Sequence, residues 1–369
     1  MPEPLDPKLY DLSARDYDAV LVVSFGGPEG PDDVMPFLEN VFRGLRVTDE
    51  TKQKIAARYQ DFGGISPING HTREFIAALK DLLEAEGPAL PIYWGNRNWQ
   101  PMLRDTVEQM ARDGIQRAAA YVTSTFSSYS GCRKYREDLF EAVSGIENAP
   151  ELDKLRVGFN HPGFITAVAD RIGESLESLP ENKRDAAGLI FTAHSLPESM
   201  SASSPYVEQL MDSAATSALL AGQEDWRLVY QSNNARYGGD PWLGPDISDA
   251  LEEEARSGRK DVIVVPIGFV CDHMEVVLDL DIDAAKRAEA AGINMIRAGT
   301  VGAHPAYIGM VRDLIVERSL ESGERLTLGP LPPKHDFCPV DCCLSGRPGP
   351  AKDSLCGEVG TPAAATDSA

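Results

Sequence analysis

The chain has 369 residues, of which 43% are hydrophobic, so it is long enough to form two domains with apolar cores. Its 57 acidic residues outnumber its 35 basic ones and give a formal net charge of −22. This charge argues against nucleic acid or an anionic membrane as a partner, because both bind to basic surfaces. No apolar run reaches about 18 residues, and we therefore expect no transmembrane segment.

Strand and helix patterns alternate through the first half of the chain. Short apolar runs that end at glycine or at polar residues predict buried strands at residues 18–25, 91–95 and 117–122. Helical patterns accompany them at residues 32–42, 50–59, 69–85, 101–112 and from about residue 133. The first strand ends in Gly26-Gly27-Pro28, which we do not interpret as a phosphate-binding loop, because no G-x-G-x-x-G pattern follows and Pro28 has no N–H.

The same alternation restarts near residue 150. Strands are predicted at residues 154–157, 187–194, 226–231, 261–267 and 294–297. Helices are predicted at residues 162–176, 206–221, 247–257, 284–291 and 304–318. Because such alternation is typical of parallel sheets with helical crossovers, the sequence predicts an α/β fold class with two Rossmann-like, doubly wound lobes and a cleft between them.

We expect five regions along the chain. An acidic N-terminal arm, residues 1–16, lacks the basic start and apolar core of a signal peptide, so we expect it to be disordered and the protein to be cytoplasmic. The first lobe covers residues 17–160 and the second lobe residues 161–328. Residues 329–344 contain the cysteine-rich segment. Residues 345–369, rich in Gly, Pro, Ala, Ser and Thr, predict a disordered tail.

His194 is the first candidate catalytic residue. It ends an apolar strand at its carboxyl end, where open α/β sheets bind ligands, and a neutral imidazole can accept a proton or bind a metal. Glu275 follows the strand at 261–267, so two strand ends in one lobe could bring both side chains together. Glu275, Asp279 and Asp283 are four residues apart and share one face of a helix. A structural histidine and a solvated acidic stripe are the alternatives that this spacing leaves open.

Three cysteines lie close together near the C-terminus. Cys338, Cys342 and Cys343 fall within six residues, and clustered cysteines in a reducing compartment bind metal more often than they form disulfides. The adjacent Cys342 and Cys343 do not easily chelate one tetrahedral ion, but they can hold different atoms of a larger iron–sulfur unit. Three reactive thiols without a metal are the alternative. A fourth ligand would come from the remaining cysteines, which are Cys132, Cys271 and Cys356.

Several motifs together resemble the ferrochelatase family. They are Gly63-Gly64-Ile65-Ser66-Pro67-Ile68, Phe191-Thr192-Ala193-His194-Ser195-Leu196-Pro197, Tyr230-Gln231-Ser232 with Trp242-Leu243-Gly244-Pro245, and Pro266-Ile267-Gly268-Phe269-Val270 with Asp272-His273-x-Glu275. They occur in the family's order and extend over about residues 18–320. The cysteine tail and the acidic composition resemble the actinobacterial branch, whose members insert Fe²⁺ into coproporphyrin III.

The resemblance implies a chelatase-like fold with the porphyrin between the lobes. It implies that His194 and Glu275 face the iron. It also implies that side chains of the first lobe contact the porphyrin, namely Ser66, Tyr135, Arg58, Tyr59 and Phe25. Some relatives carry a tyrosine facing the metal where Phe25 stands, and a phenyl ring cannot ligate iron.

The resemblance further implies a [2Fe–2S] cluster. We expect its ligands to be Cys132, Cys338, Cys342 and Cys343, since a cluster of this kind needs four thiolates. Cys356 lies in the tail that we expect to be disordered, and ordering that tail would cost backbone entropy. Cys271 lies beside the predicted active site, where a thiolate would compete for incoming iron.

The function that the resemblance implies is that of a monomeric coproporphyrin ferrochelatase of haem biosynthesis, with coproporphyrin III and Fe²⁺ as its partners. Metallation releases two pyrrole protons, for which a neutral His194 is the expected acceptor, with Glu275 and the acids after it as their path. Two alternatives are a cobalt chelatase acting on a tetrapyrrole and a carrier of haem or porphyrin without turnover.

Overall fold

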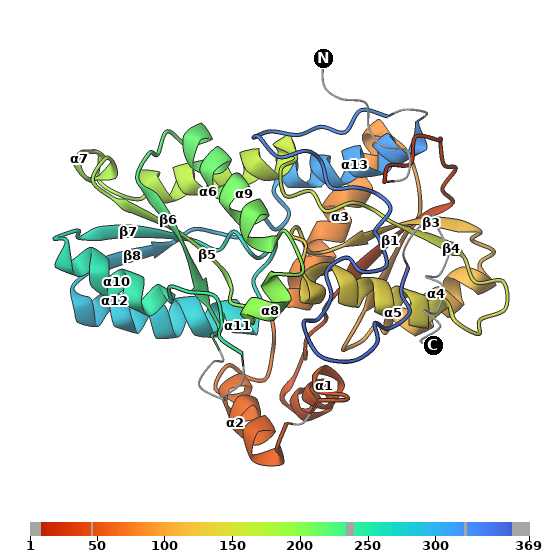
Figure 1. The fold of residues 1–369 in the computed structure, drawn as a ribbon, viewed down its shortest axis with the longest axis horizontal. Helices are drawn as coiled ribbons and strands as arrows, with labels where there is room; N and C mark the ends of the chain where they lie inside the picture. The colour runs from red at the N-terminus through yellow and green to blue at the C-terminus, as the bar shows by residue number, and fades with distance from the viewer. Residues whose placement is uncertain (1–8, 46, 234–239, 321–322, 356–369) are drawn as a thin grey trace.

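Two parallel sheets of four strands each organise the chain (Figure 1). The computed structural model describes residues 9–45, 47–233, 240–320 and 323–355. The strand order is β2-β1-β3-β4 in the first sheet and β6-β5-β7-β8 in the second, and every pair of neighbouring strands is parallel. The predicted α/β fold class with two Rossmann-like lobes is confirmed.

The first sheet consists of β1 Ala19–Ser24, β2 Ile92–Asn96, β3 Arg117–Val122 and β4 Glu151–Lys154. All of β1 is buried, and its residues alternate between two core clusters, one on each face of the sheet. Helix α3 Ile68–Glu86 packs on one face through Phe75 and Leu79. Helices α4 Leu103–Arg112 and α5 Lys134–Val143 contribute to the cluster on the other face.

The second sheet consists of β5 Gly188–His194, β6 Trp226–Gln231, β7 Asp261–Val265 and β8 Asn294–Arg297. Helices α10 Ile247–Arg256 and α12 Ala285–Ala291 contribute side chains to the cluster on one of its faces. Helices α6 Pro162–Glu177 and α9 Tyr206–Leu220 contribute to the cluster on the other face. Two short helices, α7 Glu181–Arg184 and α8 Glu198–Ser201, lie in the connections.

Helix α13 Pro305–Ser319 joins the two sheets, because it packs against α3 of the first lobe and α6 of the second. The ring of Tyr307 lies 6.1 Å from that of Phe75 on α3 and 6.1 Å from that of Phe164 on α6. Its hydroxyl group also hydrogen-bonds that of Tyr121 on β3. One apolar cluster therefore extends across both sheets, and the lobe boundary predicted at residue 160 stays a prediction.

Helices α1 Val34–Val41 and α2 Asp49–Gln60 lie apart from the sheets, at the bottom of Figure 1. A 3₁₀ turn, η1 Pro31–Asp33, leads into α1. The two helices share a small core of their own around Phe37 and Ala56. Phe25 at the end of β1 and Tyr59 on α2 pack against this core.

Two predicted strands end two or more residues away from the observed strand end. The strand expected at 154–157 is wrong, because β4 covers residues 151–154 and the apolar residues after it are buried in irregular structure. The strand expected at 261–267 ends at Val265. None of the helices in the described ranges is both long and apolar enough to cross a bilayer.

Both chain ends pack against the lobes where the structure describes them. The disorder predicted for residues 1–16 is wrong for residues 9–16, because Tyr10 and Asp11 are buried. The disorder predicted from residue 345 is wrong for residues 345–355, because Ser354 and Leu355 are buried. The rest of both predicted segments, residues 1–8 and 356–369, lies outside the described residues.

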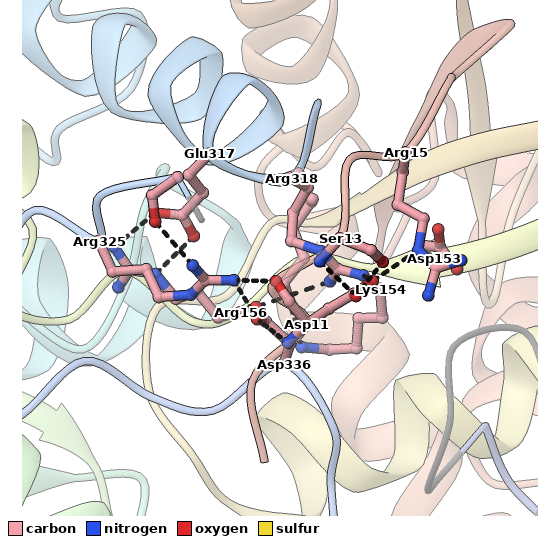
Figure 2. Close-up of polar contacts among 12 residues, drawn as sticks. Asp11, Ser13, Arg15, Asp153, Lys154, Arg156, Glu317, Arg318, Arg325 and Asp336 are labelled. Atoms are coloured by element: carbon pink, nitrogen blue, oxygen red, sulfur yellow. Dashed lines mark hydrogen bonds and ion pairs between the residues drawn. The ribbon is translucent and has the colours of Figure 1, made fainter. Parts of the chain in front are cut away.

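A network of buried charges holds these ends in place (Figure 2). Arg318, at the end of α13, lies 2.9 Å from Asp11 of the N-terminal arm and 3.6 Å from Asp336 of the C-terminal segment. Arg325 donates to the main-chain oxygen of Asp11 at 2.7 Å and also pairs with Asp336. The side chains of Arg318, Arg325, Asp11 and Asp336 are all between 0% and 5% exposed, so little water screens their interactions.

Replacing Arg318 by methionine should strongly destabilise the protein. The change leaves Asp11 and Asp336 without one of their partners in a buried place, and breaking a buried pair costs about 3–5 kcal/mol. The loss should be measured as a shift of the urea unfolding transition followed by tryptophan fluorescence. Lys54→Met is the control, because Lys54 and its partner Glu50 are 75% and 77% exposed, and it should cost less than about 1 kcal/mol. Equal effects of the two changes would contradict a stabilising role for the network.

Candidate active site and cysteine cluster

His194 lies at the carboxyl end of β5, and a close approach of two backbones brings Glu275 beside it. The loop after β7 crosses over β5, where the N–H of Gly268 donates to the oxygen of Thr192 at 3.1 Å. A Cβ atom at Gly268 would lie 2.7 Å from Ala193, so only glycine fits at this crossing. The loop then leads into α11 Met274–Val276, which carries Glu275.

His194 and Glu275 form an ion pair. The Nε2 atom of His194 lies 3.2 Å from Oε1 of Glu275, and Nδ1 contacts the main-chain oxygen of Ser195. Tyr206 on α9 holds the backbone at this point, because its hydroxyl donates to the oxygen of His194 at 3.0 Å. The imidazole is thus held on both sides, and the structural alternative for His194 is less favoured because one of its ring nitrogens meets a partly exposed carboxylate.

The acidic residues after Glu275 lie on a π-helix, η4 Val277–Ala284. Asp279 accepts a hydrogen bond from the hydroxyl of Ser232, and Asp283 pairs with Arg58 of α2 at 2.8 Å. Asp281 points elsewhere and pairs with Arg297 at 2.6 Å. Glu275, Asp279 and Asp283 therefore form a row from His194 to the surface, as their spacing predicted, and π-helices often occur at functional sites.

The pair is charged at neutral pH. Burial lowers the pKa of His194, but the charge and the hydrogen bond of Glu275 raise it overall to about 9. Burial raises the pKa of Glu275, while His194 brings it down overall to about 2. Water screens the pair in part, because the two side chains are 31% and 44% exposed. The raised pKa of His194 and the lowered pKa of Glu275 both favour an imidazolium beside a carboxylate. This state differs from the neutral imidazole that the sequence analysis expected.

Asp279 is the group of this row that titrates near neutral pH. Burial raises the pKa of Asp279, the charge of Glu275 raises it further, and the hydrogen bond from Ser232 lowers it, with a net value of about 6. Ser232 adopts a left-handed backbone conformation, with φ of 62°, at the end of β6. The carboxyl of Asp279 can therefore gain and lose a proton under conditions in which Glu275 stays ionised.

Three predicted porphyrin contacts of the first lobe lie along the segment that carries Glu275 and the acidic row. The hydroxyl of Ser66 lies 3.4 Å from the N–H of Met274, next to Glu275. Burial, and then the charge of Glu275, raise the pKa of Tyr59, which places this tyrosine within electrostatic reach of Glu275. Arg58 contacts the far end of the acidic row. The structure therefore brings Ser66 and Tyr59 close to Glu275, and Arg58 to Asp283 at the other end of the row.

Phe25 and Tyr135 both contact Arg97, a residue that the sequence analysis missed. The Arg97 guanidinium carbon is 5.5 Å from the ring centre of Phe25 and 4.5 Å from that of Tyr135, which are distances of cation–π contact. An ion pair with Asp138 of α5, at 2.5 Å, fixes the guanidinium, whose side chain is 11% exposed. Arg97 follows β2 at its carboxyl end, so the strand-end rule that identified His194 could also have identified it.

Four of the six cysteines lie together. Each of their thiols contacts two others, in the closed order Cys132, Cys338, Cys342, Cys343 and back to Cys132. The Sγ atoms of Cys342 and Cys343 are 3.4 Å apart. Hydrogen bonds from Cys338 and then Cys343 lower the pKa of Cys132, and the charges of Lys154 and Arg136 add to this effect. These surroundings favour a thiolate at Cys132.

The fold places Cys132, and not Cys271, beside the cysteines of the C-terminal segment. Burial and the charge of Asp272 raise the pKa of Cys271, which packs against the core next to the active site. Cys356 lies outside the described residues. Within the described ranges, no group of three or more His, Cys, Asp or Glu side chains is arranged as a site for a metal ion. The four converging thiols nevertheless suit a cluster with two irons, because each iron would take two of them.

The amino-acid sequence is similar to known ferrochelatases. The sequence profile of the ferrochelatase family matches residues 17–319. A ferrochelatase of Rhodopirellula baltica is 48% identical over 330 residues, which cover 89% of this chain and 93% of that protein. A coproporphyrin III ferrochelatase of Streptomyces coelicolor is 45% identical over 365 residues, which cover 92% of this chain and 96% of the relative.

A solved structure supports the fold alone. SirB from Bacillus subtilis, determined with Fe³⁺, superimposes with a TM-score of 0.50 at 13% sequence identity. The alignment covers 84% of this chain and 98% of that protein. Both lobes of the present chain therefore correspond to the arrangement of a known chelatase.

The charge of the pair can be tested by titrating His194 in the protein without substrates. Its imidazole signal in NMR should change with a midpoint near pH 9, and in Glu275→Gln the midpoint should fall well below 9, because the charge and the hydrogen bond that most strongly oppose the effect of burial are then removed. Since the pKa of His194 is higher and that of Glu275 lower in the folded chain, the pair stabilises the fold fully between about pH 4.5 and pH 6.5, and this effect is lost as pH rises through 9 and also as pH falls toward 2. The signal is assigned with His194→Ala. An equal midpoint in wild type and Glu275→Gln would contradict the ion pair.

Proposed function

The chain belongs to the ferrochelatase family, whose members insert metal into porphyrin, and on this premise we propose that it is a coproporphyrin ferrochelatase that inserts Fe²⁺ into coproporphyrin III. Relatives named for this substrate, of which the Streptomyces coelicolor enzyme is one, support the choice of porphyrin. The proposed place of the reaction is haem biosynthesis. The monomeric state and the cytoplasmic location that the sequence suggested stay predictions.

The observation that carries the proposal is the His194–Glu275 pair with donors of the first lobe opposite it. A carrier of haem would need one ligand and no row of acids leading to the surface. A cobalt chelatase would use the same groups, because a neutral imidazole and a carboxylate bind several divalent ions. The choice of iron therefore rests on the family and on the relatives' names.

Metal insertion is a proton-release reaction. The porphyrin loses two pyrrole protons and the Fe²⁺ ion loses its water, and the product is the iron porphyrin and two protons. Because His194 already carries a proton in the protein without substrates, it cannot accept another one in that state. The positive charge of Fe²⁺ beside Glu275 would oppose the attraction that holds this proton, so the pKa of His194 would fall and the imidazole would become a base.

We infer that protons leave along the acidic row. Asp279 has a pKa of about 6, so it can accept a proton at neutral pH and pass it on, whereas Glu275 stays ionised beside the imidazolium. Asp283 at the end of the row is exposed and delivers to water. The pairing of Asp283 with Arg58 keeps this end of the row next to the first lobe.

The porphyrin-binding residues are proposed from the same arrangement. Ser66 and Tyr59 lie near Glu275, Arg58 contacts Asp283, and Phe25 and Tyr135 both contact Arg97. Hydroxyl and guanidinium donors suit the carboxylates of the substrate, which must be bound in spite of the net charge of −22. Phe25 would offer an apolar ring to the macrocycle, and it supplies no oxygen to the iron.

The function is tested by anaerobic insertion of Fe²⁺ and Co²⁺ into coproporphyrin III and protoporphyrin IX, followed by absorbance. Coproporphyrin III with Fe²⁺ should give the highest kcat/KM, because a substrate with four propionates uses more of the donors. His194→Ala and Glu275→Gln should reduce kcat at least about 100-fold, the usual weight of a positioned proton-transfer group, and should keep the wild-type circular dichroism. A preference for protoporphyrin IX would refute the substrate, a preference for Co²⁺ would favour the cobalt chelatase, and no insertion at all would favour the carrier.

We also propose that Cys132, Cys338, Cys342 and Cys343 hold a [2Fe–2S] cluster. When bound, such a cluster supplies a redox-active centre and a covalent cross-link between the first lobe and the C-terminal segment. The support is the closed ring of thiol contacts, in which each thiol meets two others. The positive charges of Lys154 and Arg136 beside Cys132 would compensate part of the charge of four thiolates.

Cys132→Ser should abolish the cluster. A serine oxygen replaces one of four thiolates, so protein purified without oxygen should lose the visible absorbance and the two equivalents of iron and sulfide that a [2Fe–2S] cluster has. Cys271→Ser is the matched control, a second cysteine that packs in the interior, and should keep both signals. If Cys132→Ser keeps the cluster and Cys356→Ser loses it, the ligand set is wrong. One zinc and no sulfide in the wild type would refute the iron–sulfur proposal.

A further inference from the structure

Two fully buried arginines connect the first lobe to residues 338–355, which we call the C-terminal cysteine segment. Arg133 and Arg136 are each 1% exposed and lie one and four residues after Cys132 in the chain. Arg133 donates to the main-chain oxygens of Val340 and Lys352. Arg136 donates to those of Cys342, at 3.1 Å, and of Leu355, at 3.3 Å. Both guanidinium groups therefore donate to acceptors that lie more than 200 residues later in the chain, and Arg133 also pairs with Glu137 at 3.5 Å.

The same stretch of helix carries a predicted porphyrin contact on another side. Tyr135 lies between the two arginines in sequence, and its ring meets the Arg97 guanidinium, 4.5 Å away, which also contacts Phe25. Residues 132–136 thus bear a cysteine of the four-thiol ring, two arginines that hold the cysteine segment, and an aromatic ring that faces the porphyrin residues. A displacement on one side of this stretch moves the other side too.

The backbone at this point is a place where the helix can change. Residues Tyr129–Arg133 form a π-helical turn, η2, which begins at Ser128, and the N–H groups of Cys132 and Arg133 both donate to the oxygen of Ser128. Helix α5 continues from Lys134 with regular geometry. A π-helical turn is rare and is frequently found at functional sites. A change of register in η2 would shift Tyr135 by moving the start of α5.

The hydrogen bonds of Arg133 and Arg136 connect the cysteine segment to η2 and to the first turn of α5. If the segment moved away, both buried guanidinium groups would lose main-chain acceptors together. Arg133 would keep the carboxylate of Glu137, 3.5 Å from its Nε atom, but both arginines would lose main-chain hydrogen bonds in a buried place, which is unfavourable and would draw the guanidinium groups toward water. Tyr135, which lies between the two arginines in the first turn of α5, would then be displaced from Arg97.

We propose that Arg133 and Arg136 are positioning residues that couple occupancy of the four-thiol site to porphyrin binding at Tyr135. The inference rests on the proposed cluster and on the proposed porphyrin site. A bound cluster fixes the cysteine segment to Cys132, the arginines transmit this to the turn, and Tyr135 is held in place for the porphyrin. Because coupling between two binding equilibria is reciprocal, bound porphyrin also stabilises the cluster.

The test measures porphyrin binding and cluster loss, not turnover. In the wild type, removing the cluster with a chelator should weaken the binding of metal-free coproporphyrin III at least about tenfold, a coupling in the usual range; binding is followed by porphyrin fluorescence. Saturating porphyrin should slow the chelator-driven loss of cluster absorbance. Arg136→Lys keeps the charge but lacks the planar fork of donors. The Arg136→Lys protein that contains the cluster should bind porphyrin as weakly as the wild type without its cluster. Bound porphyrin should no longer slow the loss of the cluster in this variant.

Arg104→Lys is the matched control. Arg104 on α4 also donates to main-chain oxygens, those of Glu141 and Ser144 at the far end of α5, but it is 48% exposed and does not touch the cysteine segment. It should leave the coupling unchanged. Arg133→Lys is a second test variant in case Arg136→Lys does not fold.

The possible failures can be told apart. If the wild type binds coproporphyrin III with Kd values within twofold of each other with and without its cluster, the coupling is refuted, but the proposed cluster is not. If Arg136→Lys and Arg133→Lys both keep the wild-type coupling, the arginines are not its route. Iron and sulfide are assayed first. If the purified wild type contains neither, both the cluster and the coupling are refuted. A loaded wild type that binds no porphyrin would refute the proposed function and this inference with it.

Discussion

The packing of α13 against both lobes is the constraint on which the site depends. The rings of Phe75, Phe164 and Tyr307 bring α3, α6 and α13 into one apolar cluster, so neither sheet has a complete core without the other lobe. This packing fixes the distance between the carboxyl ends of the two sheets. The contacts of Ser66 with Met274 and of Arg58 with Asp283 follow from it, because each joins a loop or helix of one lobe to the acidic segment of the other.

Buried arginines hold the two chain ends in a protein with a large excess of acids. Arg318 and Arg325 connect the N-terminal arm to Asp336, just before the cysteine segment. Arg133 and Arg136 hold the cysteine segment itself through main-chain oxygens. A guanidinium suits both tasks, because its planar set of donors can satisfy several acceptors at once and it stays charged when buried. The C-terminal segment is therefore fixed both before and after its cysteines, and the four thiols meet without a disulfide.

The sequence predicted the parts of the fold that depend on local pattern. Apolar runs such as residues 117–122 became strands with the expected bounds, because such a run is buried on both faces of a parallel sheet. The rule that ligands bind at the carboxyl ends of parallel strands predicted that His194 and Glu275 lie together, because His194 ends one strand and Glu275 follows another strand of the same sheet. The strand at β4 was predicted three residues late, because Leu155 and Val157 are buried in the core between the lobes and not in the sheet. Apolar pattern reports burial, and it does not distinguish these two places.

Interactions between distant segments had no local signal. Arg318 and Asp11 are 307 residues apart, and nothing near either residue marks the pair. The acidic arm and the Gly- and Pro-containing tail have the composition of disordered segments, but the buried arginines of the body give their described parts fixed partners. The π-helical form of residues 277–284 also could not be read from the spacing of the acids, because an α-helix puts residues four apart on one face as well.

The charge state of the His194–Glu275 pair changes how the proposed reaction must proceed. Had the imidazole been neutral, as the sequence suggested, porphyrin alone could have given it a proton. With the ion pair formed, the base is available only after the carboxylate has a second positive partner, and Fe²⁺ is the substrate that brings one. The porphyrin is then deprotonated where and when the metal is present. A site that holds its proton until the ion arrives thus avoids stabilising a deprotonated porphyrin that has no metal to bind, and the nearly neutral pKa of Asp279 gives the released protons a first acceptor outside the pair.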